Sequence, residues 1–468
     1  VSIEQIIGGV SQAGQGWKML MQSLAAGRGV SFPATCTGGA KLTARVTGAY
    51  AVARKQFGLS IGRFEGVEEP LARIGGLTYL MDGLRLYTCG AVDAGEQPAV
   101  VSAIAKYAST ELSRKIVTDG MDILGGAGIC RGPRNLLANI YTATPISITV
   151  EGANILTRTM MIFGQGAIRC HPYVYAEIDA LDRSDVAAFD RVLWPHLGSM
   201  VRNAFRAVLL GLSRGRLARS PVRGPTAQYY RKLAWASATF AVLTDLAMFA
   251  FGGTLKRRET LTGRFADLLS WMYLGTATLR RFEAEGRQTA DLPLVDWAMN
   301  YTFAQLQQAF EGLFNNLPIP GLKLIAGWWR LNPVGVIPSD DLGARVATLL
   351  QTPGAPRDRL TQGIYLPTHP DEALGRLEQA MMLTLQTKTL FKTIKTAIQQ
   401  GKLPQAQPEH LIEAAVTAKI ATREQAELMK EAAIARNEAI QVDSFSLADY
   451  QQGIPVEWNR ETLRAIAQ

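Results

Sequence analysis

Cysteine and histidine are both scarce in this chain of 468 residues, which contains four of each. No CxxC pair and no HExxH motif occurs, and no cysteine and histidine cluster is visible. So few cysteines in so long a chain do not indicate a disulfide framework and favour a reducing compartment. The sequence therefore also predicts no metal site. The eight residues are Cys36, Cys89, Cys130, Cys170, His171, His196, His369 and His410.

Charged residues make up only 19% of the chain and hydrophobic residues 47%, which is a globular composition. The net charge is +9, with a local excess of arginine and lysine between residues 202 and 287. This excess fits a solvated basic helix face, and alternatively an anionic membrane surface or a CoA-like ligand. Neither a zinc-finger spacing nor an aromatic-basic RNA-binding pattern is present, so no nucleic-acid partner is expected.

Apolar residues recur at three- and four-residue spacing along most of the chain, which predicts an all-α fold built as a helical bundle. Only residues 1–7 and 146–150 look extended. Clusters of glycine and proline place soft boundaries near residues 175, 290 and 345. The expected parts are residues 1–175, 176–290, 291–345 and 346–468, the last with a polar helical hairpin over residues 404–437.

Two segments raise the question of membrane contact. Residues 233–255 carry one charge, Asp245, and are long enough to cross a bilayer. An aspartate at mid-span costs about 2.5–3.5 kcal/mol on insertion, which favours a buried bundle helix. Residues 319–338 are too broken by proline to span, but Trp328 and Trp329 would suit an interfacial position. A plain surface loop is the alternative there.

Glu151 stands alone as a carboxylate between two apolar runs in the stretch "TPISITVEGANILTR". A carboxylate in such a setting must be solvated, paired or functional. Gly152 leaves space beside it for a flat or thin ligand. Burial against an apolar ligand would raise its proton affinity and make it a stronger base. The alternative is a glutamate placed at a helix N-terminus for its favourable dipole interaction.

Two further stretches carry candidate binding residues. In "ARKQFG", Arg54 and Gln56 precede Phe57, and Arg54 would either grip a phosphate or complement a helix C-terminus. In "DILGGAGI", Gly125 and Gly126 would allow close approach of a ligand or simply end a helix. No strand precedes these glycines, so a dinucleotide-binding fold is not indicated.

Taken together and in order, these stretches resemble the C-terminal helical domain of acyl-CoA dehydrogenases. "ARKQFG" resembles that family's R-x-Q-F-G, "DILGGAGI" its Q-I-x-G-G-x-G, and "VEGANILTR" its catalytic E-G-T-N-D-I-L-R. The likeness covers residues 1–169, of which 1–10 resemble the end of the family's β-domain. Residues 237–283 are similar to the extra helical domain of very-long-chain members, and the tail to residue 468 resembles large membrane-associated bacterial members.

The resemblance implies a flavoenzyme that oxidises a fatty acyl-CoA to the trans-2-enoyl-CoA, the first step of fatty-acid β-oxidation. By this likeness Glu151 removes the α-proton, while the β-hydrogen passes to the flavin. Gly152 would lie against the substrate, and Arg28 matches an arginine near the catalytic carboxylate. One family branch places its base just before that arginine, where this chain has Gly27. Glu151 is therefore the expected catalytic residue.

The resemblance also implies FAD as cofactor and a homodimer. Arg54, Gln56, Phe57, Gly125 and Gly126 match positions that reach FAD across the dimer interface. Ala153 and Asn154 match positions next to the flavin. An electron-transferring flavoprotein is the expected electron acceptor, and the expected location is cytoplasmic, peripheral on the inner face of a bacterial membrane.

The family's N-terminal helical domain and most of its β-domain have no counterpart in this sequence. The chain by itself is therefore expected to bind FAD weakly and not to turn over. The alternative is a non-catalytic helical scaffold that shares the fold and docks at membranes.

Overall fold

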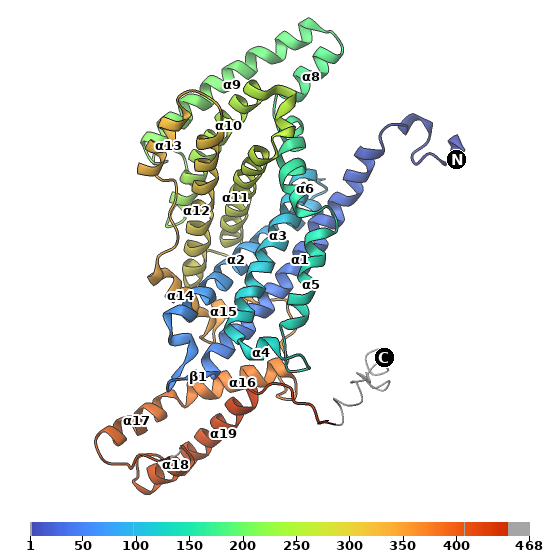
Figure 1. The fold of residues 1–468 in the computed structure, drawn as a ribbon. Helices are drawn as coiled ribbons and strands as arrows, with labels where there is room; N and C mark the ends of the chain where they lie inside the picture. Colours follow the sequence, from blue (N-terminus) through green and yellow to red (C-terminus); the bar gives the residue numbers. More distant parts are fainter. Residues whose placement is uncertain (1, 97, 407, 448–468) are drawn as a thin grey trace. The chain divides into compact units, whose positions relative to one another are not determined.

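The computed structural model describes residues 2–96, 98–406 and 408–447, and Figure 1 shows that helices make up nearly all of their regular secondary structure. They form two compact units. Unit 1 consists of residues 1–123 and 139–366, and unit 2 of residues 124–138 and 367–468. The all-α prediction is confirmed, whereas the predicted boundaries near residues 175, 290 and 345 do not coincide with these units.

The first part of unit 1 holds the helices that carry most of the predicted site. Its elements are η1 (Ile3–Gln5), η2 (Val10–Gln12), α1 (Gly16–Ala53), β1 (Lys55–Gln56), β2 (Leu59–Ser60), η3 (Ile61–Arg63), α2 (Glu65–Asp93), α3 (Ala99–Leu124), α5 (Ala138–Thr149), α6 (Asn154–Leu156), the π-helix η4 (Thr157–Gln165) and α7 (Gly166–Cys170).

The second part of unit 1 packs further helices around this group. They are α8 (Val174–Asp182), α9 (Val186–Leu212), α10 (Ala227–Phe251), η5 (Gly252–Arg257), α11 (Glu259–Ala284), η6 (Thr289–Asp291), α12 (Leu292–Asn316), α13 (Leu322–Leu331), α14 (Asp340–Leu350) and α15 (Ala355–Leu360). Unit 2 contains α4 (Gly126–Ile129), α16 (Ala373–Gln386), α17 (Lys388–Gln399), α18 (Pro408–Thr417) and α19 (Arg423–Ala439).

Helix α2 is the centre of unit 1, because α1, α11, α12 and α14 all pack against it. The contacts are close where α2 carries glycine. A Cβ atom at Gly76 would clash with the ring of Trp297, and one at Gly83 would lie 3.2 Å from the Cα of Thr278. This dense packing joins helices from residue 16 to residue 350 into one compact body.

A buried ion cluster reinforces the junction of α1, α2 and α11. The carboxylate of Asp82, which is 2% exposed, lies 3.0 Å from Lys41 Nζ and 3.3 Å from Arg281 Nη2. Arg85 adds a contact of 2.7 Å. Burial raises the pKa of Asp82, but Arg281, Lys41 and Arg85 more than offset this, and the net pKa is lowered. Asp82 therefore stays charged as the common partner of three cations.

A two-stranded hairpin that the sequence did not suggest joins α1 to α2. Its register pairs Lys55 with Ser60 and Gln56 with Leu59. The loop residues Phe57 and Gly58 both have positive φ, 51° and 76°, as a type I′ turn requires.

The two stretches predicted to be extended are both helical in part. Residues 3–5 form a 3₁₀ helix, and residues 146–149 are the last turn of α5. β-Branched side chains favour strands only where a partner strand is available, and none lies beside either described stretch.

Helix α10 is the segment whose apolar character suggested either a membrane span or a bundle helix. Within the described residues, Ala227–Arg257 is the one helical stretch long and apolar enough to cross a membrane by length and composition. Half of its most apolar window is buried inside the protein, and it packs on α9 and α11. Core helices share this property, and the contacts agree with the bundle-helix reading.

Unit 2 has a small core of its own. Its buried residues come from α17, α18, α19 and their connections and include Ile394, Ile412 and Met429. Helix α19 begins with a capping box, in which Thr422 and Gln425 each bond the other's main-chain N–H. The predicted helical hairpin over residues 404–437 is confirmed as α18 and α19. The end of the predicted tail, residues 448–468, lies outside the described residues.

Candidate active site around Glu151

Glu151 lies in the tight turn that joins α5 to α6, and its backbone is left-handed, with φ of 54°. Gly152 follows with φ of 97°. A Cβ atom on Gly152 would lie 3.1 Å from Thr157 Oγ1 and 3.6 Å from Met161 Sδ. Both the conformation and the space thus require glycine. A non-glycine residue held in the left-handed region is a feature that clusters at functional sites.

Lys106 of α3 supports this turn from inside the protein, and its side chain has no exposed surface. Its ammonium donates to the main-chain oxygen of Gly152 and to Asn154 Oδ1, both at 2.8 Å, and to the oxygen of Ile148 at 3.4 Å. All three donors of the ammonium are therefore satisfied. The sequence interpretation missed Lys106, although one cation on an apolar helix face is a readable signal.

The side chain of Asn154 belongs to the same support. Its Nδ2 donates to Thr110 Oγ1 at 2.9 Å and to Glu111 Oε1 at 2.8 Å, while its Oδ1 accepts from Lys106. Both amide N–H groups are thus used inside the protein. Ala153, by contrast, is exposed on the same turn. Flavin contacts by Ala153 and Asn154 stay predictions, and for Asn154 the structure shows a role in holding the turn.

Three charged groups meet at this turn. Arg28 of α1 is 1% exposed, and its Nη1 lies 3.8 Å from the Cβ position of Gly152. Burial lowers the pKa of Arg28, and the carboxylate of Glu151 partly offsets that shift. Burial also lowers the pKa of Lys106, to about 8, with Glu151 opposing the shift and Arg28 adding to it. Glu151 is thus the electrostatic partner of two buried cations.

One oxygen of the Glu151 carboxylate has no partner within the described chain. Oε2 is buried and accepts no hydrogen bond. An ionised oxygen in that position is costly unless it serves a ligand or takes up a proton. A carboxylate with a purely structural role would have both oxygens paired within the protein, and Glu151 Oε2 is not. Together with the glycine-only turn, it fits a substrate and a flat cofactor placed beside Gly152.

The chain continues from this turn into a π-helix, η4, instead of a regular α-helix. Thr262 of α11 donates a hydrogen bond of 2.6 Å to the main-chain oxygen of Thr159 inside it. Arg158 forms a bidentate pair with Asp267 of α11, with contacts of 2.7 and 2.5 Å. π-Helical turns are frequent at functional sites. Helix α11 therefore fixes the segment directly after the candidate base.

Three of the other predicted cofactor residues, Arg54, Gln56 and Phe57, lie far from this turn. Arg54 caps the C-terminus of α1 and stands 26 positions after Arg28, or about 39 Å along the helix at 1.5 Å per residue. Figure 1 shows the hairpin at the opposite end of α1 from α6. Gln56 is exposed, and Phe57 is 93% exposed with a left-handed backbone. Within one chain, this group does not meet Glu151.

Gly125 and Gly126 belong to unit 2, at the start of α4. Gly125 has φ of 55° and ψ of −128°, a conformation open to glycine alone. A Cβ atom at either position would meet nothing within 4 Å. The main chain is therefore accessible at this turn, as close approach of a ligand or a partner would need.

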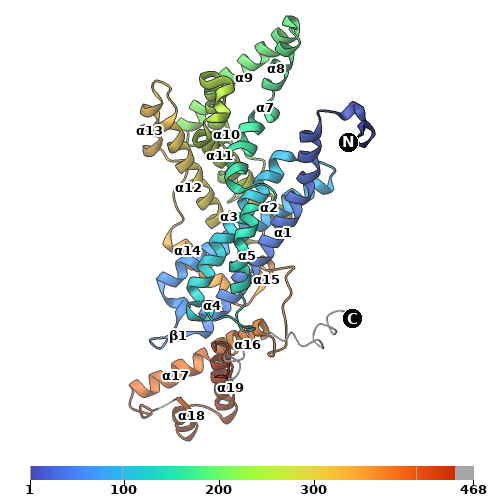
Figure 2. The same ribbon diagram turned by 45° about the vertical axis from the view of Figure 1, so that its right-hand side comes forward.

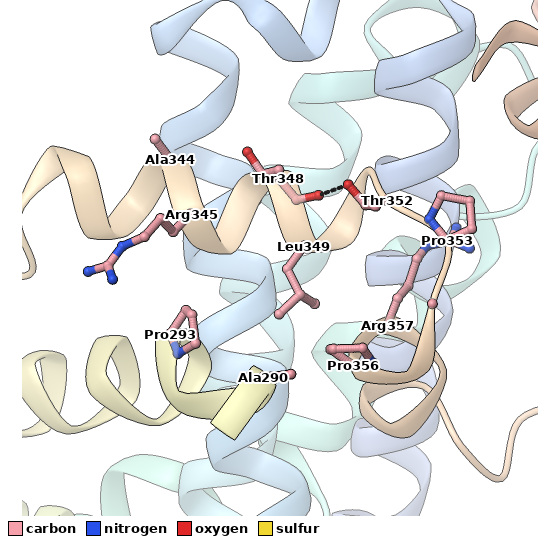
Figure 3. Close-up of a pocket in the computed structure, with 11 residues that line it drawn as sticks. Ala290, Pro293, Ala344, Arg345, Thr348, Leu349, Thr352, Pro353, Pro356 and Arg357 are labelled. Atoms are coloured by element: carbon pink, nitrogen blue, oxygen red, sulfur yellow. Dashed lines mark hydrogen bonds between the residues drawn. The ribbon is translucent and has the colours of Figure 1, made fainter. Parts of the chain in front are cut away.

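A cavity of about 490 Å³ opens elsewhere in unit 1, between α12, α14 and α15. Figure 3 shows Leu349 of α14 pointing into it, near Ala290 and Pro356. This cavity shares no residue with the predicted site, so it is no evidence for substrate binding around Glu151.

Comparison with known proteins gives the class to which this fold and site belong. Residues 14–162 match the family described as "Acyl-CoA dehydrogenase, C-terminal domain", and residues 168–445 match "Acyl-CoA dehydrogenase, C-terminal, bacterial type". The junction of the two matches lies close to the predicted boundary near residue 175. The chain belongs to the acyl-CoA dehydrogenase family.

Individual relatives agree with this assignment. The chain is 24% identical over 327 residues to "Probable acyl-CoA dehydrogenase FadE10" of Mycobacterium tuberculosis, covering 66% of this chain and 48% of that protein. It is 28% identical over 159 residues to the mouse mitochondrial very long-chain specific acyl-CoA dehydrogenase, covering 34% of this chain and 23% of that one.

A solved structure shares the fold. The acyl-CoA dehydrogenase complexed with FAD from Bacillus anthracis aligns with a TM-score of 0.57 and 17% identity, over 72% of this chain and 57% of that chain. The two relatives that match most of this chain are longer proteins, and the chain spans about half the length of each.

Proposed function

We propose that this chain forms the catalytic helical part of an enzyme that converts a fatty acyl-CoA to the trans-2-enoyl-CoA, with Glu151 as the base. The observation that carries the proposal is the buried Oε2 atom of Glu151, which accepts no hydrogen bond although the carboxylate lies among buried cations. A proton acceptor must be held firmly and still have a free lone pair.

The chain's own residues would act as follows. Glu151 accepts the α-proton of the thioester on Oε2, and Gly152 leaves room for the flat reacting carbons. Arg28 and Lys106 are the buried cations that interact electrostatically with this carboxylate. Gly152 leaves the space in which FAD would be held, and that cofactor, when bound, would supply the acceptor for the β-hydrogen and its electron pair. The bound acyl chain would exclude water from the reacting carbons.

Glu151→Gln in the complete enzyme tests this proposal, since the amide keeps the size of the side chain and cannot take the proton. We expect turnover to fall at least about 100-fold, with FAD absorbance unchanged. Glu65→Gln, at an exposed glutamate on α2, is the matched control. Full activity of Glu151→Gln would overturn the proposal and favour the alternative, a non-catalytic scaffold.

We also propose a homodimer in which the hairpin end of α1 serves the partner's flavin. Support comes from the separation of about 39 Å between Arg54 and Arg28, and from the exposed Phe57 at the hairpin tip. A second chain is needed to bring both ends to one cofactor. Phe57→Ala should lower FAD occupancy in the purified enzyme, whereas Leu324→Ala, at another exposed apolar residue, should not.

The family suggests an electron-transferring flavoprotein as the electron acceptor. The test is reduction of that flavoprotein by acyl-CoA in the presence of the complete enzyme. Reaction with oxygen at an equal or greater rate would contradict this part of the proposal.

We place the enzyme in the cytoplasm, peripheral on an anionic membrane, and assign the contact to α9 rather than to the tryptophan pair. Trp329 is only 2% exposed and packs on Trp235, Phe310 and Phe314, so it is a core residue. Helix α9 instead exposes a row of large apolar side chains. They are Val186, Trp194, Leu197, Val201, Phe205, Val208 and Leu212.

Charge favours an anionic lipid as the occupant of this α9 face. Arg202 and Arg206 are exposed on α9, and four exposed arginines follow its end: Arg214, Arg216, Arg219 and Arg223. An apolar helix face flanked by arginine is the pattern of an interfacial helix. Figure 2 shows α8 and α9 at one end of unit 1, beyond α10 and α11.

Flotation with vesicles containing anionic lipid tests this contact. Phe205→Asp should abolish flotation, because it places a carboxylate on the apolar face. Phe249→Asp, at a phenylalanine 89% exposed on α10, is the matched control and should float normally. Equal flotation of both variants would reject α9 as the contact. Equal binding to neutral vesicles would reject the role of the arginines.

A further inference from the structure

Three metal-binding side chains converge in unit 1, outside the candidate active site. His171 follows α7, His196 lies on α9 and Asp245 lies on α10. His171 Nε2 is 3.0 Å and His196 Nε2 is 3.6 Å from Asp245 Oδ1. All three ligand atoms lie within 4.8 Å of one another. The residues are 74 and 49 positions apart from Asp245 in the sequence, which is why no metal motif was visible there.

The polar atoms of this cluster are not balanced by the protein alone. His196 Nδ1 lies 2.7 Å from Glu177 Oε1, so it carries the proton and donates it to that carboxylate. In the neutral ring, the lone pair is then on Nε2, which is buried and has no hydrogen-bond partner among the described residues. This lone pair faces an oxygen of Asp245, which also carries lone pairs. A cation between the two would remove the repulsion.

We propose that His171, His196 and Asp245 bind a divalent transition-metal ion of the zinc class, with Glu177 as the carboxylate that orients His196. In tetrahedral coordination with bonds of about 2.0–2.1 Å, neighbouring ligand atoms lie about 3.3 Å apart. The separations of the two histidine nitrogens from Asp245 Oδ1, 3.0 and 3.6 Å, bracket that value, and all three ligand atoms lie within 4.8 Å of one another. Two histidines and one carboxylate leave the fourth position to water.

The surrounding side chains fit such a site. A histidine ligand commonly donates its other ring N–H to a carboxylate, which fixes the tautomer and raises the basicity of the ligand. Glu177 supplies that group to His196. The ring of Tyr173 stacks on His196, with ring centroids 5.3 Å apart and planes at 18°. The ion would join α9 to α10 and to the segment that begins α8.

Binding requires one tautomer change. In the metal-free protein, His171 Nδ1 accepts from the main-chain N–H of Tyr173 and Val174 at 3.3 and 3.2 Å, so Nε2 carries the ring proton and donates it to Asp245. On binding, that proton moves to Nδ1 and Nε2 takes the metal, with no change in the charge of the ring. A protonated Nδ1 cannot face the two main-chain N–H donors, so the ring turns away from them as these two long contacts are given up.

Cobalt titration tests the proposal without any assay of catalysis. The protein is stripped with EDTA, and Co²⁺ is added while its visible d–d absorption is followed; Zn²⁺ should then displace it. We expect one ion per chain and a rise in melting temperature with Zn²⁺. His171→Asn should lose at least about 100-fold in affinity, and Glu177→Gln about 10–100-fold. Asparagine keeps an acceptor for the start of α8, so His171→Asn should still fold.

A second histidine–aspartate pair in the same chain provides the control. His369 Nδ1 lies 3.2 Å from Asp371 Oδ2, but both side chains are exposed. His369→Asn should bind the ion as the unaltered protein does. The proposal is overturned if no tight cobalt spectrum appears. It is also overturned if His171→Asn and Asp245→Asn bind as well as His369→Asn, because surface histidines would then account for the binding.

Discussion

The ammonium of Lys106 donates a hydrogen bond of 2.8 Å to the main-chain oxygen of Gly152, the residue that follows Glu151. The same group bonds Asn154 and the oxygen of Ile148, so one side chain of α3 holds both sides of the turn. A fully buried lysine is unusual because its burial is costly. Here that cost is offset by three acceptors and by the nearby carboxylate, which ties the position of Glu151 to α3.

Replacing Lys106 with methionine should loosen this turn. The change leaves up to three oxygens without their donor, each worth about 1–3 kcal/mol when buried. We expect lower resistance to urea and, in the complete enzyme, a fall in kcat larger than the change in KM. Lys115→Met, on the exposed face of the same helix, is the control: it removes only an exposed hydrogen bond to Tyr301 and should change both quantities much less.

The depressed pKa of Lys106 makes stability depend on pH in a defined direction. The folded protein releases this proton near pH 8, whereas the unfolded chain holds it to about pH 10.4. Between these values the unfolded state binds more protons, so the free energy of unfolding should rise with pH. Below pH 8 both states are protonated and the burial cost is fully present. Urea midpoints at several pH values, compared with those of Lys106→Met, measure this contribution.

Gly152→Ala should destabilise the protein although it adds a single methyl group. The residue has φ of 97°, and the new Cβ would lie 3.1 Å from Thr157 Oγ1. The backbone conformation alone costs an L-residue about 1–2 kcal/mol. Gly27→Ala is the matched control, since that glycine lies inside α1 with open space around it. Alanine there should stabilise the helix by about 0.5–1 kcal/mol. Equal effects of the two substitutions on the melting temperature would contradict the conclusion that position 152 requires glycine.

Asp82→Asn should be among the most damaging single changes in unit 1. It removes the charge shared by Lys41, Arg85 and Arg281, two of which are nearly inaccessible to solvent. Breaking a buried ion pair costs about 3–5 kcal/mol, because the remaining charges lose their partner. Asp190→Asn, at an exposed position on α9, should change stability by less than about 0.5 kcal/mol. Chemical unfolding of the two variants gives the comparison.

Local patterns predicted the helices well, because apolar periodicity records which face of each helix is buried. They failed where the outcome depends on a neighbour. Ile146–Thr149 have strand-forming side chains but no partner strand, and they complete α5. The hairpin at Phe57 depends on two left-handed residues, of which only Gly58 is a recognisable signal.

In the candidate site, too, local sequence indicates some residues, and only the folded chain brings the others together. The sequence singles out Glu151 and Gly152 because the lone carboxylate and the glycine are adjacent, and their roles stay predictions. Lys106 and the group of His171, His196 and Asp245 are not singled out, because each depends on helices that meet only in the folded chain. Trp329 was misjudged for a related reason: composition made it an interfacial residue, whereas α12 and α10 bury it.

Loss of the base at Glu151 and loss of the hairpin at Phe57 would both abolish activity, but the length of α1 keeps the two changes apart. Because Glu151 lies near Arg28 of α1, about 39 Å along the helix from Arg54 and the hairpin, a Glu151→Gln chain keeps an intact hairpin, and a chain altered at Arg54 and Phe57 keeps an intact base. If sites are shared across a dimer, co-expression of these two inactive chains should complement: one of the two centres in each mixed pair would combine the undamaged end of each subunit and regain activity.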